Sequence, residues 1–559
     1  MTDSVQTGWV KPPHQIIGLD HLGVQAPCIQ IYSQLLPGIT NVTDRARYYS
    51  LYPWLLARFE KAGWRSEAQI QTMLRRAECL LTLIGLQHEH SLQDGSDDHR
   101  AAMVGVDTLV KAISRVNQGE RIAISEYSEL AESENRYFAN PFGGLGQYYF
   151  GALWELGLLG GDSPKAMRLP KGTGTVIAEM VERYVPGDTF IEAIKSDQVD
   201  QTLLETLSPF CGCRLKEAAE ECEALIGVML KGWEVLNPVE VASVDEVAAN
   251  SARSRSLAYL CLLADAAGHS GKSFGLTEFR AMSYSQHDTH GREVSLPDAL
   301  IETDSYWKVY HRNELLSIAL QGLFFATLRA AELSGRRFFD TRSMSDWFWL
   351  EGDGTVVIEA IDVDVDTSSA WMKKLANQLP AFSDWNHPAH EIQCMERVSK
   401  TTNKNGVKSA ELFEIVEDSL RILSAVLFRE ENQVGYGNIQ FPEGYLEYYP
   451  VNIDSVVKDW SGQLSSMEIK RALAIFSKNN CLDTHLRVAM RKLRQQGQNT
   501  FRFEPGEIAI TIKEIPKAAH TTPRFKQAIR ILLDLGILER DQSLLRTSQR
   551  GNAFVESAL

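Results

Sequence analysis

Apolar residues recur at spacings of three and four positions along most of this chain, which is the pattern of amphipathic helices. The helices that this spacing predicts are, in chain order, Thr43–Glu60, Glu67–Leu86, Asp98–Val116, Leu203–Val235, Tyr306–Leu333, Ser369–Leu379, Ser409–Phe428 and Asp483–Gln496. Pro53 interrupts the first of them, and we expect it to kink or end that helix because proline lacks the amide hydrogen that a helix needs. The sequence therefore predicts a mainly α-helical protein.

The hydrophobic period changes at one place in the second half of the chain. Trp347–Leu350 and Thr355–Ile361 flank Glu351–Gly354, whose two glycines can adopt the positive φ of a tight turn. Two apolar segments around such a turn are typical of a hairpin. We expect one small β-hairpin here.

An internal repeat relates two segments that lie far apart in the sequence. Ala152–Leu159 aligns with Ile531–Leu538, and each ends in a Leu-Gly pair followed by two apolar residues. A polar turn, a strand-like piece and a second glycine follow, 17 residues after Gly157 in one copy and 15 residues after Gly536 in the other. We expect both Gly157 and Gly536 to end a helix in the left-handed conformation.

A helix, a left-handed glycine, a short hairpin and a closing helix are also the last elements of a winged-helix domain, and both copies resemble that family. The resemblance covers about 140–190 and 475–559. It implies a binding function, because winged helices bind DNA, RNA and proteins alike. The chain is then expected to contain an N-terminal helical region (1–138), a first winged-helix-like module (139–190), a helical body (191–345), a hairpin and helical region (346–470) and a basic C-terminal winged-helix-like module (471–559).

The composition is that of a folded globular protein, with 44% hydrophobic and 23% charged residues. No stretch approaches the roughly 18 consecutive apolar residues that a membrane span needs, and the first residues lack the pattern of a secretory signal. The eight cysteines are scattered, which is typical of reduced thiols in a reducing compartment. We therefore expect a cytoplasmic protein that has no membrane partner.

Charge is unevenly distributed along the chain. The formal net charge is −15, but Cys481–Leu559 contains thirteen lysines and arginines against eight acidic residues, so it carries +5 and the remainder −20. Phosphate binding requires a positive field, so we expect DNA to bind at the C-terminal module. The acidic helical body suits protein partners, and an oligomer is compatible with this distribution.

The predicted helix Asp483–Gln496 places Arg487, Arg491 and Arg494 at positions i, i+4 and i+7, which form one stripe. The apolar positions expected to form its core face are Leu486, Ala489, Met490 and Leu493. The residues predicted to contact nucleic acid are Arg487, Arg491, Lys492, Arg494, Arg524, Lys526, Arg530, Arg546 and Arg550. The alternative is that these cations form a solvated face or pair with carboxylates of this chain.

A second candidate surface is the run Arg45–Trp54, which interleaves arginines with aromatic residues. The residues predicted to form a protein-partner interface there are Arg45, Arg47, Tyr48, Tyr52 and Trp54. The same side chains could instead be buried core, or could stack on bases. In the first repeat copy, Gln147–Leu158 contains no lysine or arginine, so we expect a protein contact or a structural role there.

Three groups of residues contain side chains suited to metal binding or catalysis. The loop 88–99 contains His88, His90, Asp94, Asp97, Asp98 and His99, and it is expected to be a hydrated acidic loop. Cys211, Cys213 and Cys222 have no histidine nearby in the sequence, so we expect buried thiols rather than a zinc site. Residues 266–273 match the loosest form of a phosphate-binding loop, but they follow a predicted helix rather than a strand. We therefore expect no metal, no cofactor and no catalytic residue.

Segments such as Ile39–Trp54 and His485–Phe503 resemble uncharacterised bacterial proteins encoded near antiphage defence genes. This resemblance implies a non-catalytic subunit that binds DNA or acts as a scaffold in a multiprotein complex. Two alternatives stay open. One is a kleisin-like architectural partner of a chromosome-organising ATPase, and the other is a metal- or nucleotide-dependent enzyme.

Overall fold

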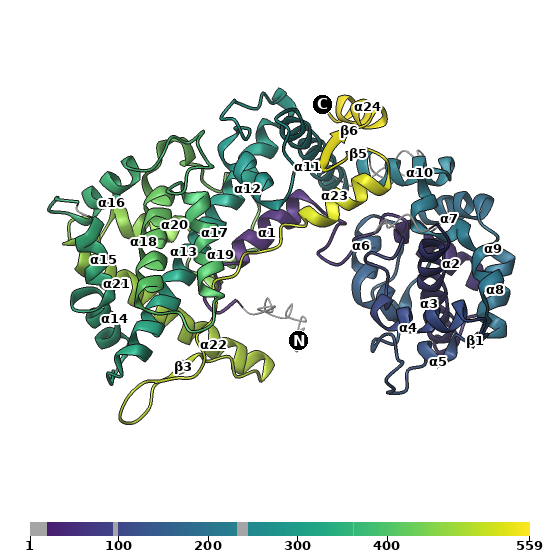
Figure 1. Ribbon diagram of the computed structural model, residues 1–559, viewed down its shortest axis with the longest axis horizontal. Helices are drawn as coiled ribbons and strands as arrows, with labels where there is room; N and C mark the ends of the chain where they lie inside the picture. The colour runs from purple at the N-terminus through teal and green to yellow at the C-terminus, as the bar shows by residue number, and fades with distance from the viewer. Residues whose placement is uncertain (1–19, 93–98, 171, 232–243, 362, 438) are drawn as a thin grey trace, which may run out of the picture. The chain divides into compact units, whose positions relative to one another are not determined.

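The computed structural model describes residues 20–92, 99–170, 172–231, 244–361, 363–437 and 439–559. In these residues the chain is mainly α-helical, and its strands form three two-stranded antiparallel sheets (Figure 1). The predicted fold class is therefore confirmed. Asp98 and Val235, at the ends of two predicted helices, lie outside the described residues.

The described residues divide into two compact units, each assembled from several segments. Unit 1 comprises residues 20–31, 280–293 and 305–521. Unit 2 comprises residues 32–279, 294–304 and 522–559.

The divisions between the units fall inside α1 (Ala26–Leu35), α12 (Leu276–Ser285) and α13 (Ile301–Ser334). Residues 471–559, which the sequence groups as one basic module, are shared between the two units. The division of the chain into five regions stays a prediction.

Unit 1 is a helical body with one short hairpin. Its further helices are α14 (Thr341–Leu350), α15 (Asp353–Ile361), α16 (Ser368–Asn377), α17 (Glu391–Thr402), α18 (Ser409–Phe428), α19 (Tyr445–Tyr448), α20 (Ile453–Ser461), α21 (Ile469–Ser477) and α22 (Asp483–Gln496), with the short turns η8 (Glu430–Asn432) and η9 (Lys478–Leu482). The hairpin pairs β3 (Phe503–Glu504) with β4 (Thr511–Ile512). The predicted bounds of α18 and α22 are confirmed.

Unit 2 is also helical, and α2 packs along α7 in its core (Figure 1). Its helices are α2 (Tyr48–Lys61), α3 (Glu67–Leu92), α4 (Val106–Asn117), α5 (Ser125–Ser128), α6 (Phe150–Glu155), α7 (Thr173–Tyr184), α8 (Gly187–Ser196), α9 (Gln201–Thr206), α10 (Ala219–Ile226), α11 (Val244–His269), α23 (Phe525–Asp534) and α24 (Gln549–Ala558). Its short turns are η1 (Leu145–Tyr149), η2 (Pro164–Ala166), η3 (Ser208–Phe210), η4 (Gly212–Lys216), η5 (Gly227–Lys231) and η7 (Asp298–Leu300). Its strands pair β1 (Ile122–Ala123) with β2 (Gln198–Val199), and β5 (Leu538–Asp541) with β6 (Leu544–Thr547). Pro53 lies inside α2 and does not end it.

The hairpin predicted around Glu351–Gly354 is wrong, because both flanking segments are helical and form α14 and α15. Neither Gly352 nor Gly354 has a positive φ. A Cβ on Gly354 would instead lie 2.8 Å from the carbonyl oxygen of Phe348. The glycines therefore let two helices meet at a tight corner, a role that the sequence pattern does not distinguish from a turn.

The two copies of the internal repeat end their first helix in the same way. Gly157 has a φ of 66°, and the next amide, of Leu158, donates to the carbonyl oxygen of Leu153 at 2.8 Å. Gly536 has a φ of 67°, and the equivalent hydrogen bond is 2.9 Å long. The predicted left-handed glycine is confirmed in both copies.

The closing helices of the repeat also pack alike. A Cβ on Gly174 of α7 would lie 2.5 Å from the carbonyl oxygen of Leu158, and one on Gly551 of α24 would lie 2.2 Å from that of Ile537. Only glycine allows so close an approach to backbone. The two segments are thus a structural repeat, and their membership of the winged-helix family stays a prediction.

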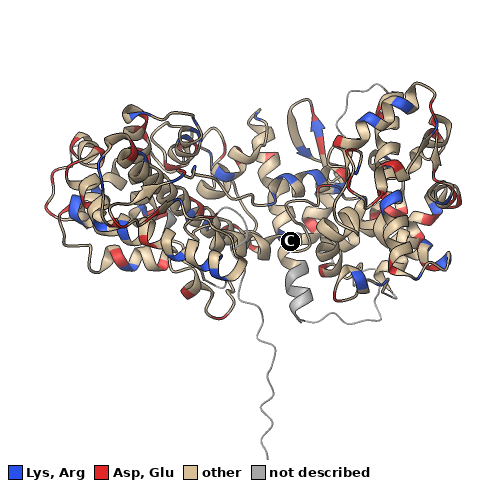
Figure 2. Cartoon of the chain, turned by 90° about the horizontal axis from the view of Figure 1, so that it is seen from below, with Lys and Arg blue, Asp and Glu red and all other residues tan. Residues whose placement is uncertain are grey.

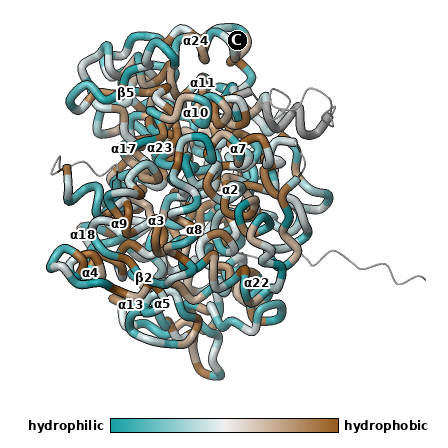
Figure 3. The backbone as a smooth tube through the Cα atoms, turned by 90° about the vertical axis from the view of Figure 1, so that its right-hand side faces the viewer, coloured by the Kyte–Doolittle hydropathy of each residue, from teal (hydrophilic) through white to brown (hydrophobic). Residues whose placement is uncertain are grey.

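Among the described residues, one stretch, Asp298–Ser334, is long and apolar enough to cross a membrane, and 89% of its most apolar window is buried inside the protein. A helix that is apolar on all sides requires burial, and here other helices supply it. The tube in Figure 3 shows hydrophobic and hydrophilic residues interspersed along the described chain.

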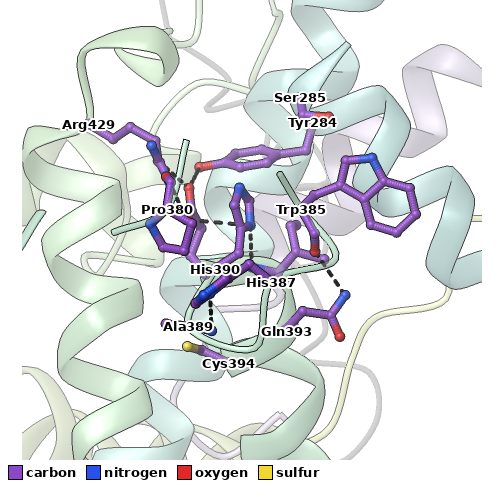
Figure 4. A network of polar contacts seen from close by, with 12 residues as sticks. Tyr284, Ser285, Pro380, Trp385, His387, Ala389, His390, Gln393, Cys394 and Arg429 are labelled. Carbon is purple, nitrogen blue, oxygen red and sulfur yellow. Dashed lines mark hydrogen bonds and ion pairs between the residues drawn. The ribbon is translucent and has the colours of Figure 1, made fainter. Parts of the chain in front are cut away.

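A buried ion pair lies where α12, α17 and the end of α18 meet in unit 1 (Figure 4). Nε and Nη2 of Arg429 donate to the two carboxylate oxygens of Glu391 at 2.5 and 2.9 Å. The hydroxyl of Tyr284 donates to the same carboxylate at 2.9 Å. The Glu391 carboxylate therefore accepts three hydrogen bonds from Arg429 and Tyr284 inside the core.

Candidate nucleic-acid interface

Three arginines of α22 line one cleft of unit 1, as their spacing in the sequence predicts. The cleft has a volume of about 480 Å³, and we call it the arginine cleft. Its lining residues include Arg487, Arg491, Arg494, Tyr448, Glu447 and Met490. It therefore combines positive charge with an aromatic ring and apolar side chains.

Arg491 is held against α19 at the wall of this cleft. Its guanidinium carbon lies 4.1 Å from the centroid of the Tyr448 ring, and Nη1 donates to the carbonyl oxygen of Tyr448. The Tyr448 hydroxyl donates to Oε1 of Gln495 at 3.0 Å. Burial lowers the pKa of Arg491, but an arginine remains a cation at neutral pH. One cation of the cleft is thus fixed in place by a stacked ring.

Arg487 and Arg494 are exposed on the same stripe. Nη2 of Arg487 donates to Oγ1 of Thr484 at 2.7 Å. No carboxylate of the described residues lies within ion-pair distance of either guanidinium. The neighbouring hairpin differs, because its cation Arg502 pairs with Glu514. Arg487 and Arg494 are therefore available to an external anion.

α22 buries only part of the face that its apolar spacing predicts, because Ala489 is buried and Leu486 half-buried. Lys492 is 1% exposed, and its Nζ donates to the carbonyl oxygen of Asp20 at 2.9 Å. Met490 and Leu493 are 41% and 38% exposed. Lys492 is therefore not available to nucleic acid, and the expectation that Met490 and Leu493 lie in the core is wrong. The physical reason is the backbone at Asp20, whose carbonyl oxygen offers the buried amine a hydrogen-bond acceptor.

Two predicted contacts in unit 2 are engaged within the protein. Nη1 of Arg524 donates to the carbonyl oxygen of Leu36 at 2.7 Å, and burial lowers the pKa of this guanidinium. Arg550 pairs with Glu223 at 3.2 Å. Both arginines therefore serve the packing of unit 2, although the sequence assigns them to a DNA-binding surface.

The nine predicted contacts do not belong to one module. Arg487 to Arg494 lie in unit 1, and Arg524 to Arg550 lie in unit 2, where Lys526 and Arg546 are exposed and Arg530 is half-buried. Figure 2 shows basic and acidic residues interspersed over the described helices. The excess positive charge of the C-terminal segment is therefore distributed over two units. The arginine cleft contains the three arginines that α22 contributes to this charge.

The run Arg45–Trp54 is core in unit 2, as the alternative interpretation of its sequence holds. The five residues assigned to a partner interface, each at most 1% exposed, are Arg45, Arg47, Tyr48, Tyr52 and Trp54. Arg47 forms a buried ion pair with Glu221 at 3.0 Å. The prediction of a surface there is corrected, because Arg45 and Arg47 pair with the carboxylates of Asp534 and Glu221 inside unit 2.

The first repeat copy presents one large aromatic residue. Trp154 of α6 is 58% exposed. Glu155, the one charged residue of α6, is held within unit 2, where its carboxylate accepts the amide of Gly38 at 2.7 Å. The protein contact expected for this copy stays a prediction.

The loosely matched phosphate-binding loop at residues 266–273 overlaps the last turn of α11, so a helix rather than a strand leads into it. The arrangement of a strand, a glycine-rich loop and a helix that nucleotide binding requires is therefore not formed at these residues.

The cysteine cluster does have histidine neighbours, which corrects the expectation from the sequence. His88 and His99 lie beside Cys211 and Cys213, whereas Cys222 lies apart, near Leu535. His90 is described, but Asp94, Asp97 and Asp98 lie outside the described residues. The sequence shows both halves of this four-residue cluster, yet 112 residues separate His99 from Cys211, and no local spacing connects them.

Comparison with known proteins adds no assignment. No protein-family model matches this sequence, and neither the curated proteins nor the solved structures that were compared contain a match.

Proposed function

We propose that this protein is a non-catalytic, DNA-binding subunit of a larger complex, and that DNA binds at the arginine cleft. The observation that carries the proposal is the alignment of Arg487, Arg491 and Arg494 along one cleft beside the ring of Tyr448. Guanidinium groups bind phosphate oxygens through two parallel hydrogen bonds.

The three arginines contribute in different ways to this proposal. Arg491 is fixed by Tyr448 and the backbone, so its remaining donors are oriented before a ligand arrives. Arg487 and Arg494 are exposed and can follow the phosphates of a backbone. Glu447 also lines the cleft, and its carboxylate repels phosphate at one side, so the favoured contacts are on the α22 side.

The test is a charge reversal with a matched control. The double variant Arg487→Glu, Arg494→Glu should weaken binding of a labelled DNA duplex about 100-fold in fluorescence anisotropy, because two charge-assisted contacts of about 1.5 kcal/mol each are lost. The control is Lys373→Glu, Lys374→Glu, which makes the same change in net charge on exposed residues of α16 in the same unit. The control should bind as tightly as the unmodified chain.

The outcomes distinguish DNA binding at the arginine cleft from general electrostatic attraction of DNA to the protein. Equal weakening of both variants would mean that overall charge, rather than the arginine cleft, governs binding. No binding of duplex or single-stranded DNA by the unmodified chain at low salt would refute the proposal.

A scaffold function is the second candidate, and the exposed Trp154 favours it. Exposed aromatic side chains are enriched in the centres of protein interfaces. Trp154→Ala should release a partner that co-purifies with the unmodified chain, and it should leave DNA binding at the arginine cleft unchanged. Retention of every partner by Trp154→Ala would count against this candidate.

The proposal places the protein in the cytoplasm. All eight cysteines are free thiols, and most are buried. Free thiols are stable in a reducing compartment, where disulfides are rare. The resemblance to proteins encoded near antiphage defence genes remains a prediction about the complex in which this subunit would act.

A further inference from the structure

Two histidines and two cysteines meet inside unit 2. Nδ1 of His99 lies 3.4 Å from Sγ of Cys211, and Nδ1 of His88 lies 3.3 Å from Sγ of Cys213. The four potential ligand atoms all lie within 4.8 Å of one another. Cys211, His88 and His99 are buried, and Cys213 is half-buried.

These distances are close to those of a tetrahedral zinc site. Zinc binds cysteine sulfur at about 2.3 Å and histidine nitrogen at about 2.0 Å, so the edges of its ligand tetrahedron measure about 3.3 to 3.8 Å. The two sulfur–nitrogen distances of 3.3 and 3.4 Å already match such edges. The widest separation, 4.8 Å, needs a closure of about 1 Å, which side-chain rotation can supply.

The backbone of unit 2 is shaped to bring the two histidines together. His88 lies near the end of α3, and a Cβ on Gly85, one turn earlier, would lie 2.6 Å from the carbonyl oxygen of His99. The chain that follows His99 is tied to the same helix, because the hydroxyl of Thr82 donates to the carbonyl oxygen of Val104 at 2.8 Å. Glycine at position 85 therefore permits a close approach that any larger residue would block.

Two buried arginines hold the backbone of the two segments that carry the cluster. Nη1 of Arg47 donates to the carbonyl oxygens of Pro209 and Cys211 at 2.6 and 2.5 Å. Nη1 of Arg45 donates to the carbonyl oxygen of Ala101 at 3.3 Å, two residues after His99. The arginine-rich start of α2 thus fixes both segments that carry the cluster, which gives these core arginines a positioning role.

We propose that His88, His99, Cys211 and Cys213 form a structural zinc site. Two thiolates and two imidazoles are the donor set typical of structural Zn²⁺ sites, and two thiolates neutralise its charge in a buried site. Four protein ligands leave no position for water or substrate, so the site cross-links the fold and does not catalyse. This inference is independent of DNA binding at the arginine cleft, which lies in unit 1.

Arg214 is the neighbour that must adjust when the metal binds. Its Nη2 lies 3.3 Å from Nε2 of His88, and a metal on Nδ1 would leave a proton on Nε2, facing a donor. Nη1 of Arg214 already donates to both carboxylate oxygens of Glu217 at 2.6 and 2.7 Å. The half-exposed Arg214 side chain can therefore turn toward Glu217, and the freed Nε2–H gains access to water.

A route for the metal exists at Cys213. This residue lines a cavity of about 400 Å³ in unit 2, together with Gly212, Lys216 and Asp534. Cys211 is fully buried behind it. The same burial argues against Cys211 as a nucleophile, because a nucleophilic thiol must be reached by its substrate.

The first experiment measures the metal in the full-length chain. The protein is purified without chelator from cells supplied with zinc, and its zinc is measured by atomic emission. One zinc per chain is expected. Cys211→Ser and Cys213→Ser should each lose most of it, and the matched control Cys222→Ser, a buried thiol of α10 outside the cluster, should retain it. Zinc retained by the Cys211 and Cys213 variants would overturn the proposal.

Cobalt identifies the ligands directly. The chain is stripped of metal by dialysis against a chelator under reducing conditions and is then titrated with Co²⁺. A tetrahedral site with thiolates gives strong visible bands and a thiolate-to-cobalt charge-transfer band, which the Cys222→Ser variant should share. An unmodified chain that develops neither band, or only the weak bands of six-coordinate Co²⁺, would overturn the proposal.

If the serine variants fail to fold, the zinc site can still be tested on the unmodified chain. Its thiols are alkylated before and after chelation, and the modified cysteines are identified by peptide mass spectrometry. Chelation should expose Cys211 and Cys213 and leave Cys222 unchanged. Equal labelling of Cys211 and Cys213 with and without chelator would show that no metal protects them and would refute the site.

Discussion

Sγ of Cys213 lies 3.3 Å from Nδ1 of His88, although 125 residues separate the two in the sequence. The contact joins the end of α3 to the turn η4. α3 packs against α2, and η4 packs against α10 and α23. A metal bound at this contact would therefore cross-link α3 to η4, two segments that are far apart in the sequence.

Removal of the metal should loosen this junction in unit 2 alone. In hydrogen exchange with mass spectrometry, a chelator should raise exchange in peptides that cover 82–92 and 205–217, because the cross-link between them is lost. Peptides of α18 in unit 1 serve as the internal control and should not change. Faster exchange throughout the chain would indicate a general effect of the chelator.

Breaking the buried pair of Glu391 and Arg429 should destabilise unit 1 strongly. Glu391→Gln removes the charge that compensates Arg429, and the loss of one partner of a buried ion pair costs about 3 to 5 kcal/mol. Tyr284→Phe removes a single hydrogen bond to the same carboxylate and should cost about 1 kcal/mol. Urea unfolding followed by circular dichroism measures both. Equal losses for the two variants would mean that solvent reaches Arg429.

Several helices were predictable from sequence, but the described part of Leu203–Val235 is divided between α9, η3, η4, α10 and η5. Apolar spacing gives α18 and α22 their correct bounds, because the helical period is local. It wrongly places Met490 and Leu493 of α22 in the core, since the acceptor that draws Lys492 inward is Asp20, 472 residues away. Local pattern does not contain that partner.

The metal cluster, which the sequence did not predict, and the hairpin, which it predicted wrongly, both show that a local sequence pattern does not determine long-range contacts. The sequence contains all four ligands, but as two separate groups, each of which is weak evidence for a metal. It also contains Gly352 and Gly354, which suit a turn and a helix corner equally well. Chemistry that depends on long-range contacts is visible only after the chain is folded.

Replacement of Gly551, the second glycine of the repeat, should lower the free energy of unfolding, and Gly63 is the matched control. Gly551→Ala would place a Cβ 2.2 Å from the carbonyl oxygen of Ile537, so α24 must shift, at a cost of about 3 kcal/mol. Gly63→Ala, also in unit 2, meets nothing within 4 Å and carries only the strain of its φ of 73°, about 1 kcal/mol. Unfolding midpoints in urea compare the two. A smaller loss for Gly551→Ala than for Gly63→Ala would contradict the close approach.

Acid should destabilise unit 1 through His485. Burial lowers its pKa to about 4, and the nearby cations Arg502 and Lys492 add to the effect. The unfolded chain has the ordinary histidine pKa of about 6.5, so below that pH it binds a proton that the native chain does not. Stability is therefore complete above about pH 6.5 and falls as the pH approaches 4, by about 3 kcal/mol for this group.

His485→Gln tests this assignment. Glutamine does not titrate, and it can keep an acceptor for the amide of Arg502, which donates to Nε2 of His485 at 2.9 Å. The variant should lose less stability between pH 7 and pH 5 than the unmodified chain, whatever its stability at pH 7. An unchanged pH dependence would assign the acid effect to other groups.

The salt dependence of DNA binding should report how many arginines of the cleft contact phosphate. The logarithm of the binding constant falls with the logarithm of salt concentration by about 0.9 for each phosphate contacted on duplex DNA. Arg487→Ala, Arg494→Ala should therefore reduce this slope by about 2, and Lys373→Ala, Lys374→Ala should leave it unchanged. Tyr448→Ala removes the ring that fixes Arg491 but no charge, so it should weaken binding and leave the slope nearly the same. A slope that the two arginine substitutions do not alter would mean that phosphate is bound elsewhere.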